Sequence, residues 1–194
     1  MFDKYLKETE IIDFSNKEIQ DLAQILSKDC ISDEEIAKKV FLYVRDEIRH
    51  VGDYKLNINT CKASDVLKQK AGWCYSKAHL LAALLRANGI PTGISYQRLS
   101  CNEYIKNIYC LHGLNSIYLK RHGWYRVDSR GNKEGVNAKF NPPFESLAFE
   151  LGENEFDIDE VYSEPLSEIV DFLQTKFDSF DEMMESIPDL KRKN

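Results

Sequence analysis

Three residues of the types used in acyl-transfer chemistry occur in the order Cys74, His112 and Asp128. A thiolate is a nucleophile, an imidazole can take up and return its proton, and a carboxylate can hold that imidazole in one tautomer. Cys74 follows Gly72 at the expected start of a buried helix, where free backbone N–H groups and the helix dipole stabilise a thiolate. The same N–H groups, including that of Cys74, could stabilise an oxyanion. A lone cysteine is more often a small buried hydrophobe, so the two partner residues decide the interpretation.

His112 and Asp128 lie on two segments that are rich in β-branched and aromatic residues and are therefore predicted to be strands. With a three-residue hairpin loop, Leu119 faces Gly123, and Asp128 falls opposite Leu114 and diagonal to His112. This register brings the backbones of His112 and Asp128 within about 7–8 Å, close enough for their side chains to meet. A slip of one residue would separate them.

Alternation along the hairpin defines two faces. The face predicted to carry the site holds His112, Ser116, Tyr118, Trp124, Arg126 and Asp128. The opposite face, expected to pack on the core, holds Leu111, Ile117, Leu119, Tyr125 and Val127. If the hairpin packs against the Cys74 helix, four aromatic residues are expected to surround the cleft and bind substrate: Trp73, Tyr75, Tyr118 and Trp124. Ordinary packing of these rings in the core is an equally weighted alternative.

Helical patterns precede the strands along the chain. Apolar residues recur at helical spacing over 19–26 and 36–48, each run following a capping-box pattern that begins at Ser15 or Ser32. Residues 73–88 are apolar over much of their circumference, which predicts a buried helix, and Gly89 followed by Ile90-Pro91 ends it.

Strands are expected at 93–99, 108–119 and 123–127, mostly loop at 129–160, and one or two short helices at 166–184. Helices first and antiparallel strands second indicate an α+β fold. In such a fold the buried helix that carries Cys74 packs against the sheet.

Composition narrows the class of protein. The chain has 194 residues, of which 43% are hydrophobic and 30% charged, as expected for one folded domain rather than a disordered chain. We expect a single domain over residues 1–194, with a core at about 32–132 and accessory helices before and after it. The net charge of −6 argues against nucleic-acid or anionic-membrane binding. No apolar run reaches the ~18 residues that a membrane span requires.

Five cysteines is an odd number, so at least one thiol has no partner within the chain. The first residues lack the apolar segment of a secretion signal, which favours reduced thiols and a cytoplasmic protein. Cys30 and Cys61 are expected to be packing residues. Cys101, Cys110 and His112 suggest zinc, but no close pair of cysteines is present, so no metal and no cofactor are predicted.

The remaining histidines have simpler expected roles. His79 lies about 140° around the helix from Cys74 and is predicted to be structural. His50, at a helix end, and His122, in the hairpin loop, are expected to face solvent. Lys77 and Arg86 are expected at the surface, with Lys77 able to reach the mouth of the site.

The segments around these residues resemble the transglutaminase-like superfamily. Gly72-Trp73-Cys74, Ala78 and the run from Ala82 to Gly93 are similar to its core motif, and the segments holding His112 and Gly123–Asp128 are similar to its second and third catalytic blocks. The resemblance extends from about Val40 to Asn132. It implies a papain-like fold and acyl transfer through a thioester, to an amine or to water.

The sequence therefore predicts a cysteine-dependent enzyme in which Cys74 is the nucleophile, His112 the general base and acid, and Asp128 the residue that orients the imidazole. The expected substrate is a protein or peptide amide, hydrolysed or transamidated, with hydrolysis favoured because nothing marks a lysine-accepting site. The alternative is an inactive papain-like fold that binds a peptide or protein. Neither nucleic acid nor membrane is an expected partner.

Overall fold

The computed structural model describes residues 2–101 and 108–189. Its helical elements are the 3₁₀ turn η1 (Asp3–Tyr5), α1 (Lys17–Ser27), α2 (Asp33–Glu47), α3 (Val51–Tyr54), α4 (Ala63–Gln69), α5 (Cys74–Ala87), α6 (Ser167–Gln174) and α7 (Phe180–Glu185). Its strands are β1 (Arg49–His50), β2 (Ala71–Gly72), β3 (Thr92–Ser100), β4 (Tyr109–Leu119), β5 (Gly123–Val127) and β6 (Phe156–Tyr162). The expected α+β class is confirmed.

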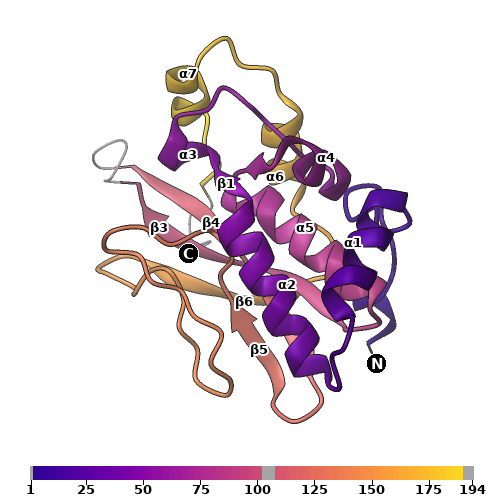
Figure 1. Ribbon diagram of the computed structural model, residues 1–194. Helices are drawn as coiled ribbons and strands as arrows, with labels where there is room; N and C mark the ends of the chain where they lie inside the picture. Colours follow the sequence, from indigo (N-terminus) through magenta and orange to yellow (C-terminus); the bar gives the residue numbers. More distant parts are fainter. Residues whose placement is uncertain (1, 102–107, 190–194) are drawn as a thin grey trace.

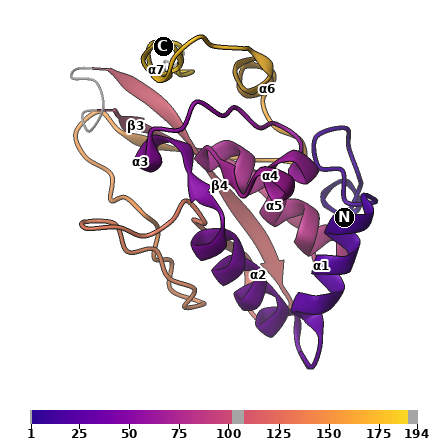
Figure 2. The same cartoon turned by 45° about the horizontal axis from the view of Figure 1, so that its top comes forward.

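Strands β3 to β6 form one antiparallel sheet in the order β5-β4-β3-β6. Helix α5 packs on this sheet, while α1, α2 and α4 surround the helix on its other sides (Figure 1). Short strands β1 and β2 pair in parallel, with His50 opposite Gly72, and so tie the end of α2 to the start of α5. Turning the molecule shows α6 and α7 together beyond the Cys74 end of α5 (Figure 2).

Local signals account for most helix boundaries. The Ser32 side chain accepts a hydrogen bond from Glu35 N–H, as the capping pattern predicts. The first cap is one residue later than expected, because Asn16 rather than Ser15 accepts from Glu18 N–H. Gly89 adopts φ +71°, the left-handed conformation that ends α5.

Two cations of α5 are buried, so the expectation that they lie at the surface is wrong. The Lys77 ammonium donates to the carbonyls of Ile48 and Arg45 at the end of α2. The Arg86 guanidinium donates to three carbonyls, those of Thr92, Lys7 and Ser163. Backbone oxygens thus replace water around both charges, which links α5 to distant parts of the chain.

One strand is absent from the expected pattern. β6 forms the edge of the sheet next to β3, within a stretch expected to be loop. Its acidic residues hide the alternation of a strand, yet acidic side chains suit an exposed edge. Among them, Asp157 accepts hydrogen bonds from Arg126 and Gln97.

Cys101 and Cys110 form a disulfide across the ends of β3 and β4. The expectation that all five thiols are reduced is therefore wrong for this pair, and the cytoplasmic placement that depended on it stays only a prediction. Both sulfurs are consumed, so neither is available as a zinc thiolate. Within residues 2–101 and 108–189, no helix is long and apolar enough to cross a membrane, and no cluster of three His, Cys, Asp or Glu side chains could hold a metal.

Candidate active site

Cys74 is the first residue of α5, and the helix has no side-chain cap, since Trp73 at the N-cap position supplies none. The backbone N–H groups of the first turn therefore stay available near the Cys74 sulfur. Gly72 is needed just before this turn, because a Cβ there would lie 2.5 Å from Ser76 Oγ. The sequence Gly-Trp-Cys thus brings β2 close to the helix that it precedes.

His112 and Asp128 meet as the predicted register requires. Leu119 pairs with Gly123 and Asn115 with Val127, which leaves Asp128 just past the end of β5. His112 Nε2 lies 2.7 Å from Asp128 Oδ2.

The carboxylate of Asp128 is also held by backbone, since its oxygens accept hydrogen bonds from the N–H groups of Arg130 and Ala148, each at 3.1 Å. Asp128 is fully buried, and His112 is nearly so. These contacts fix the imidazole from the side away from Cys74.

The start of α5 packs directly against β4 beside this pair. Gly113 N–H donates to Cys74 Sγ at 3.4 Å, and Cys74 lies close enough to His112 to raise the pKa of the imidazole. A Cβ at Gly113 would lie 2.9 Å from Tyr75 Cα, so only glycine permits this approach. With Nε2 bonded to Asp128, Nδ1 is the nitrogen left for Cys74.

Charges around His112 favour its protonated form. Burial alone would lower the pKa of His112, but the negative charges of Asp128 and Cys74 and its hydrogen bonds to both raise that pKa to about 10. Burial likewise opposes the ionised form of Asp128, but His112 and the two backbone N–H groups lower the pKa of that carboxyl. The pair is therefore an imidazolium and a carboxylate at neutral pH.

A cavity of about 290 Å³ opens onto Cys74 and His112. Trp73 and Tyr75 line it, as expected for substrate-binding aromatics, together with the disulfide and the side chains of His50, Arg130, Phe149 and Ile187. The Phe149 ring lies edge-on to His112, with 5.2 Å between centroids, and covers the imidazole.

The structure does not bring Tyr118 and Trp124 to this cavity. Both lie at the far end of the hairpin, where Tyr118 packs on Phe2 with 4.1 Å between ring centroids, and Trp124 packs on Tyr5 at 4.8 Å. Six residues separate His112 from Tyr118, which is about 20 Å along a strand. Lying on the same strand face as His112 therefore does not bring Tyr118 or Trp124 to the cavity.

His50 is buried and lines the cavity, so the expectation that it faces solvent is wrong. Its ring lies edge-on to Trp73 with 5.7 Å between centroids. Nδ1 is 3.7 Å from Asp53 Oδ2 and has no hydrogen-bond partner among the described residues. Burial and the charge of Arg130 lower the pKa of His50 well below its usual value, so the imidazole is neutral.

The other two histidines lie outside the site. His79 is buried, and its Nδ1 bonds to the Cys61 carbonyl at 2.8 Å, consistent with a structural role. His122 lies in the hairpin loop and contacts Glu34 at 3.1 Å.

Arg130 and Asp53 form an ion pair beside the cavity that sequence reasoning missed. The two guanidinium nitrogens donate to the two carboxylate oxygens at 2.7 and 2.9 Å, and Lys133 adds a third contact. The guanidinium also lies 5.4 Å from the centre of the Phe149 ring. The segment that follows Asp128 is thereby anchored to α3.

A cysteine at the start of a buried helix, packed on an antiparallel hairpin that carries a buried His–Asp pair, defines the papain-like class of α+β folds. The family model of the transglutaminase-like superfamily matches residues 20–129, more than half of the chain. The chain therefore belongs to that superfamily. No curated protein matches it.

One solved structure of low sequence identity shares this fold, and a second aligns less closely. A protein described as "a Putative Cysteine Protease" from Cytophaga hutchinsonii aligns with a TM-score of 0.51 and 19% identity, over 65% of this chain and 40% of that one. The periplasmic domain of TgpA from Pseudomonas aeruginosa aligns with a TM-score of 0.47 and 20% identity, over 64% of this chain and 45% of that one. The chain thus spans less than half the length of either.

Proposed function

We propose that the protein is a cysteine-dependent hydrolase of protein or peptide amides. The observation that carries this proposal is the buried contact of 2.7 Å between His112 and Asp128, beside a Cys74 sulfur that opens into the same cavity. A buried imidazolium–carboxylate pair next to a thiol at a helix start is the arrangement that thiol acyl transfer needs. We propose that residues 1–194 act as one domain, with the core at about 32–132.

The reaction proceeds in two halves. His112 takes the Cys74 proton, and the resulting thiolate attacks the amide carbonyl carbon. The C–N bond breaks as His112 gives that proton to the leaving amine, which leaves a thioester on Cys74. Water then attacks the thioester as His112 accepts one of its protons. The C–S bond breaks, and the carboxylic acid departs. Water is the only co-reactant besides the amide substrate, and Asp128 keeps the imidazole oriented throughout.

Charge develops on the carbonyl oxygen in both halves. The uncapped N-terminus of α5 offers the Cys74 N–H as a donor to that oxygen, and the helix dipole adds to its effect. Phe149 and the buried pair exclude water from one wall of the cavity, which strengthens these interactions.

Trapping of the acyl-enzyme tests this function. Incubation with a panel of activated esters and peptide amides, followed by rapid acid quench and intact mass, should show an adduct on Cys74. His112→Gln should reduce its formation by about 100-fold or more. Cys61→Ala, which removes a thiol outside the cavity, should leave adduct formation unchanged. A folded protein that forms no adduct but binds peptides would support the alternative, a binding module.

A further inference from the structure

One edge of β4 is open beside Cys74. Strand β3 pairs with β4 along its whole length, but β5 reaches only from Leu119 back to Asn115. Among the described residues, the stretch Tyr109–Leu114 therefore has no strand partner on the β5 side. The N–H groups of Leu111 and Gly113 point to this side, because neighbouring odd-numbered residues face the same edge of a strand.

Three backbone groups at this edge have identified contacts. Gly113 N–H donates to the Cys74 sulfur, and the Leu111 carbonyl accepts from Tyr75 Oη at 2.5 Å. The Leu111 N–H donates to the carbonyl of Pro188 at 2.8 Å. A segment from beyond α7 thus lies against the sheet edge that adjoins the candidate nucleophile.

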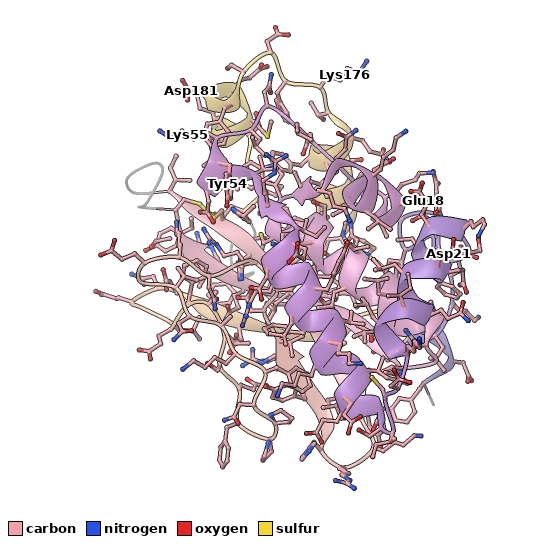
Figure 3. The ribbon with its side chains drawn as sticks, viewed as in Figure 1. Glu18, Asp21, Tyr54, Lys55, Lys176 and Asp181 are labelled. Carbon is pink, nitrogen blue, oxygen red and sulfur yellow. A yellow bond between two sulfur atoms is a disulfide. The ribbon has the colours of Figure 1, made fainter. Side chains whose placement is uncertain are left out.

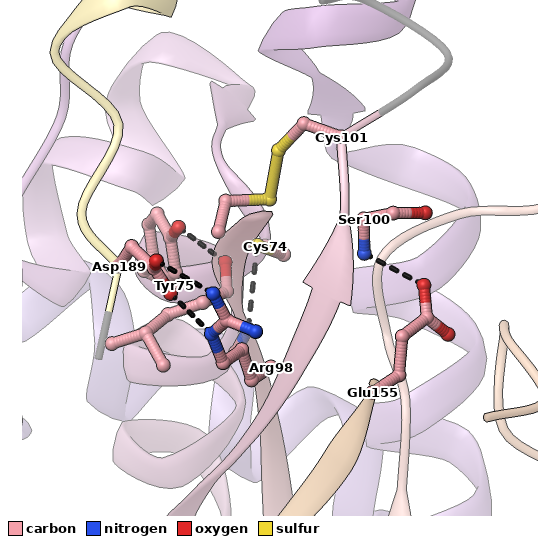
Figure 4. The surroundings of a disulfide bond; sticks show 10 residues. Cys74, Tyr75, Arg98, Ser100, Cys101, Glu155 and Asp189 are labelled. Carbon is pink, nitrogen blue, oxygen red and sulfur yellow. Dashed lines mark hydrogen bonds and ion pairs between the residues drawn. A yellow bond between two sulfur atoms is a disulfide. The ribbon is translucent and has the colours of Figure 1, made fainter. Parts of the chain in front are cut away.

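Residues 187–189 are held there by three contacts. Besides the Pro188 carbonyl, the Ile187 side chain lines the cavity. The Asp189 carboxylate takes two hydrogen bonds from the Arg98 guanidinium on β3, at 2.6 and 2.9 Å. Figure 4 shows Asp189, Arg98, Tyr75 and Cys74 close together, below the disulfide.

This position is the one that a substrate backbone requires. Leu111 and Gly113 are two residues apart, which is about 7 Å along the strand. A peptide whose carbonyl bonds to Leu111 N–H therefore places a neighbouring residue next to the Cys74 sulfur. Extended peptides add to open strand edges through main-chain hydrogen bonds, while side-chain pockets set specificity.

We propose that the open edge of β4 and Arg98 form a binding subsite for an extended acidic peptide, and that residues 187–189 occupy it in place of substrate. This inference rests on the proposed function, because it assigns that enzyme its substrate class and an internal competitor. The Leu111 N–H binds the carbonyl of one residue, and Arg98 binds the carboxylate of the next. A substrate must displace residues 187–189 to bind.

The contacts of residues 187–189 are suited to displacement. The Arg98 and Asp189 side chains keep 12% and 24% of their exposure, so water and salt reach the pair and a substrate carboxylate can compete for Arg98. Helix α7 itself is anchored separately. The Trp73 ring stacks on Phe180 with 6.2 Å between centroids, and Trp73 Nε1 donates to Met183 Sδ. The segment can therefore leave the edge while α7 stays in place.

Peptide binding to an inactive chain tests the subsite. All proteins carry Cys74→Ala, so that binding is measured without turnover. The probe is a fluorescein-labelled synthetic peptide with the sequence of residues 185–192, followed by fluorescence polarisation. A chain that ends at Ser186 should bind it saturably, and the full chain about tenfold more weakly, as expected if the internal segment is docked about nine-tenths of the time. The same peptide with Asp189→Lys should bind at least about tenfold more weakly than the original.

A point variant covers the case in which the shortened chain does not fold. In the full chain, Asp189→Lys should release the segment and strengthen binding of the probe severalfold. The matched control is Asp181→Asn on α7, an exposed carboxylate at the outside of the molecule (Figure 3), and it should leave binding unchanged.

Each result separates this inference from the proposed function. Equal probe affinity in the full chain, the shortened chain and the Asp189→Lys variant would overturn the inference, even if Cys74 forms acyl adducts. Saturable binding with the expected order of affinities, but no acyl adduct on the active protein, would support the subsite and contradict the proposed chemistry.

Discussion

The Asp128 carboxylate holds His112 Nε2 at 2.7 Å with both side chains buried, and it is itself held by two backbone N–H groups. An ion pair this buried is weak as a source of stability but effective in fixing one geometry. Because Nε2 is taken by Asp128, Nδ1 is the nitrogen that can act on Cys74.

Replacing the carboxylate with an amide should impair the reaction while keeping the shape of the side chain. Asp128→Asn removes the charge that keeps His112 protonated, so kcat/KM should fall by about 100-fold or more. The assay is turnover of whichever substrate gives the acyl-enzyme. Asp181→Asn is the control, and equal activity of both variants would contradict the role of Asp128.

The His112–Asp128 pair should leave a defined pH signature in stability. The pKa of His112 is raised to about 10, so its contribution is full below its unfolded pKa of about 6.5 and is lost as pH rises through 10. The pKa of Asp128 is lowered, so its contribution is full above about 3.8 and is lost as pH falls through its folded pKa. Urea unfolding of wild type and His112→Gln should therefore differ most between about pH 4 and 6.5. A difference that grows from pH 7 to 10 would contradict the assignment.

Gly113 should be intolerant of any side chain. In Gly113→Ala the new Cβ would lie 2.9 Å from Tyr75 Cα, which is backbone and cannot move aside cheaply. The start of α5 must shift away from β4, at a cost of about 1–3 kcal/mol in the free energy of unfolding. Urea unfolding measures the cost, and intact-mass adduct formation should also fall. Wild-type stability with wild-type reactivity would show that the close packing at Cys74 is not needed.

Asp53 should be important for stability because Arg130 is nearly buried. Asp53→Asn would remove the carboxylate charge that faces the buried guanidinium and lower the free energy of unfolding by about 3 kcal/mol. Chemical denaturation provides the value. Asp21→Asn, which removes an exposed partner of Lys17, should cost well under 1 kcal/mol.

The disulfide should be detectable as a reduced number of free thiols. Ellman titration of the unfolded, unreduced protein should find three thiols rather than five: Cys30, Cys61 and Cys74. Because the bond closes a loop of about ten residues, Cys101→Ala with Cys110→Ala should lower stability by about 2–3 kcal/mol. Five titratable thiols in protein purified without reductant would contradict the pairing.

The sequence predicted the arrangement of the three candidate catalytic residues better than it predicted the residues around them. Gly-Trp-Cys before a buried helix, and a hairpin register fixed by Leu119 and Gly123, were enough to bring His112 to Asp128, because helix starts and strand registers follow local rules. His50 and Arg130 were not found, since each becomes part of the cavity only through contacts between distant segments. The strand pattern placed Tyr118 on the same face as His112 but could not show that it lies at the far end of that face.

The fold, too, was predictable from the sequence where it depends on local pattern and not where it depends on contacts between distant segments. The helix and strand order indicated the α+β class, while β6 was hidden by the acidic residues that suit an edge. Cys101 and Cys110 are nine residues apart, and only the β3–β4 register, which joins Ser100 to Tyr109, shows that the two thiols meet. Lys77 and Arg86 are buried because carbonyl groups at the ends of other elements surround them, and no pattern within α5 records those partners.

The most direct test of the account compares two thiols of one chain. Cys30 is half-buried and far from the candidate site, whereas Cys74 is less exposed and lies beside His112. Iodoacetamide at pH 6, with each site quantified by peptide mass, should modify Cys74 at least about tenfold faster than Cys30, and His112→Gln should abolish the difference. Modification of Cys74 at or below the rate of Cys30 would contradict its activation by His112 and Asp128.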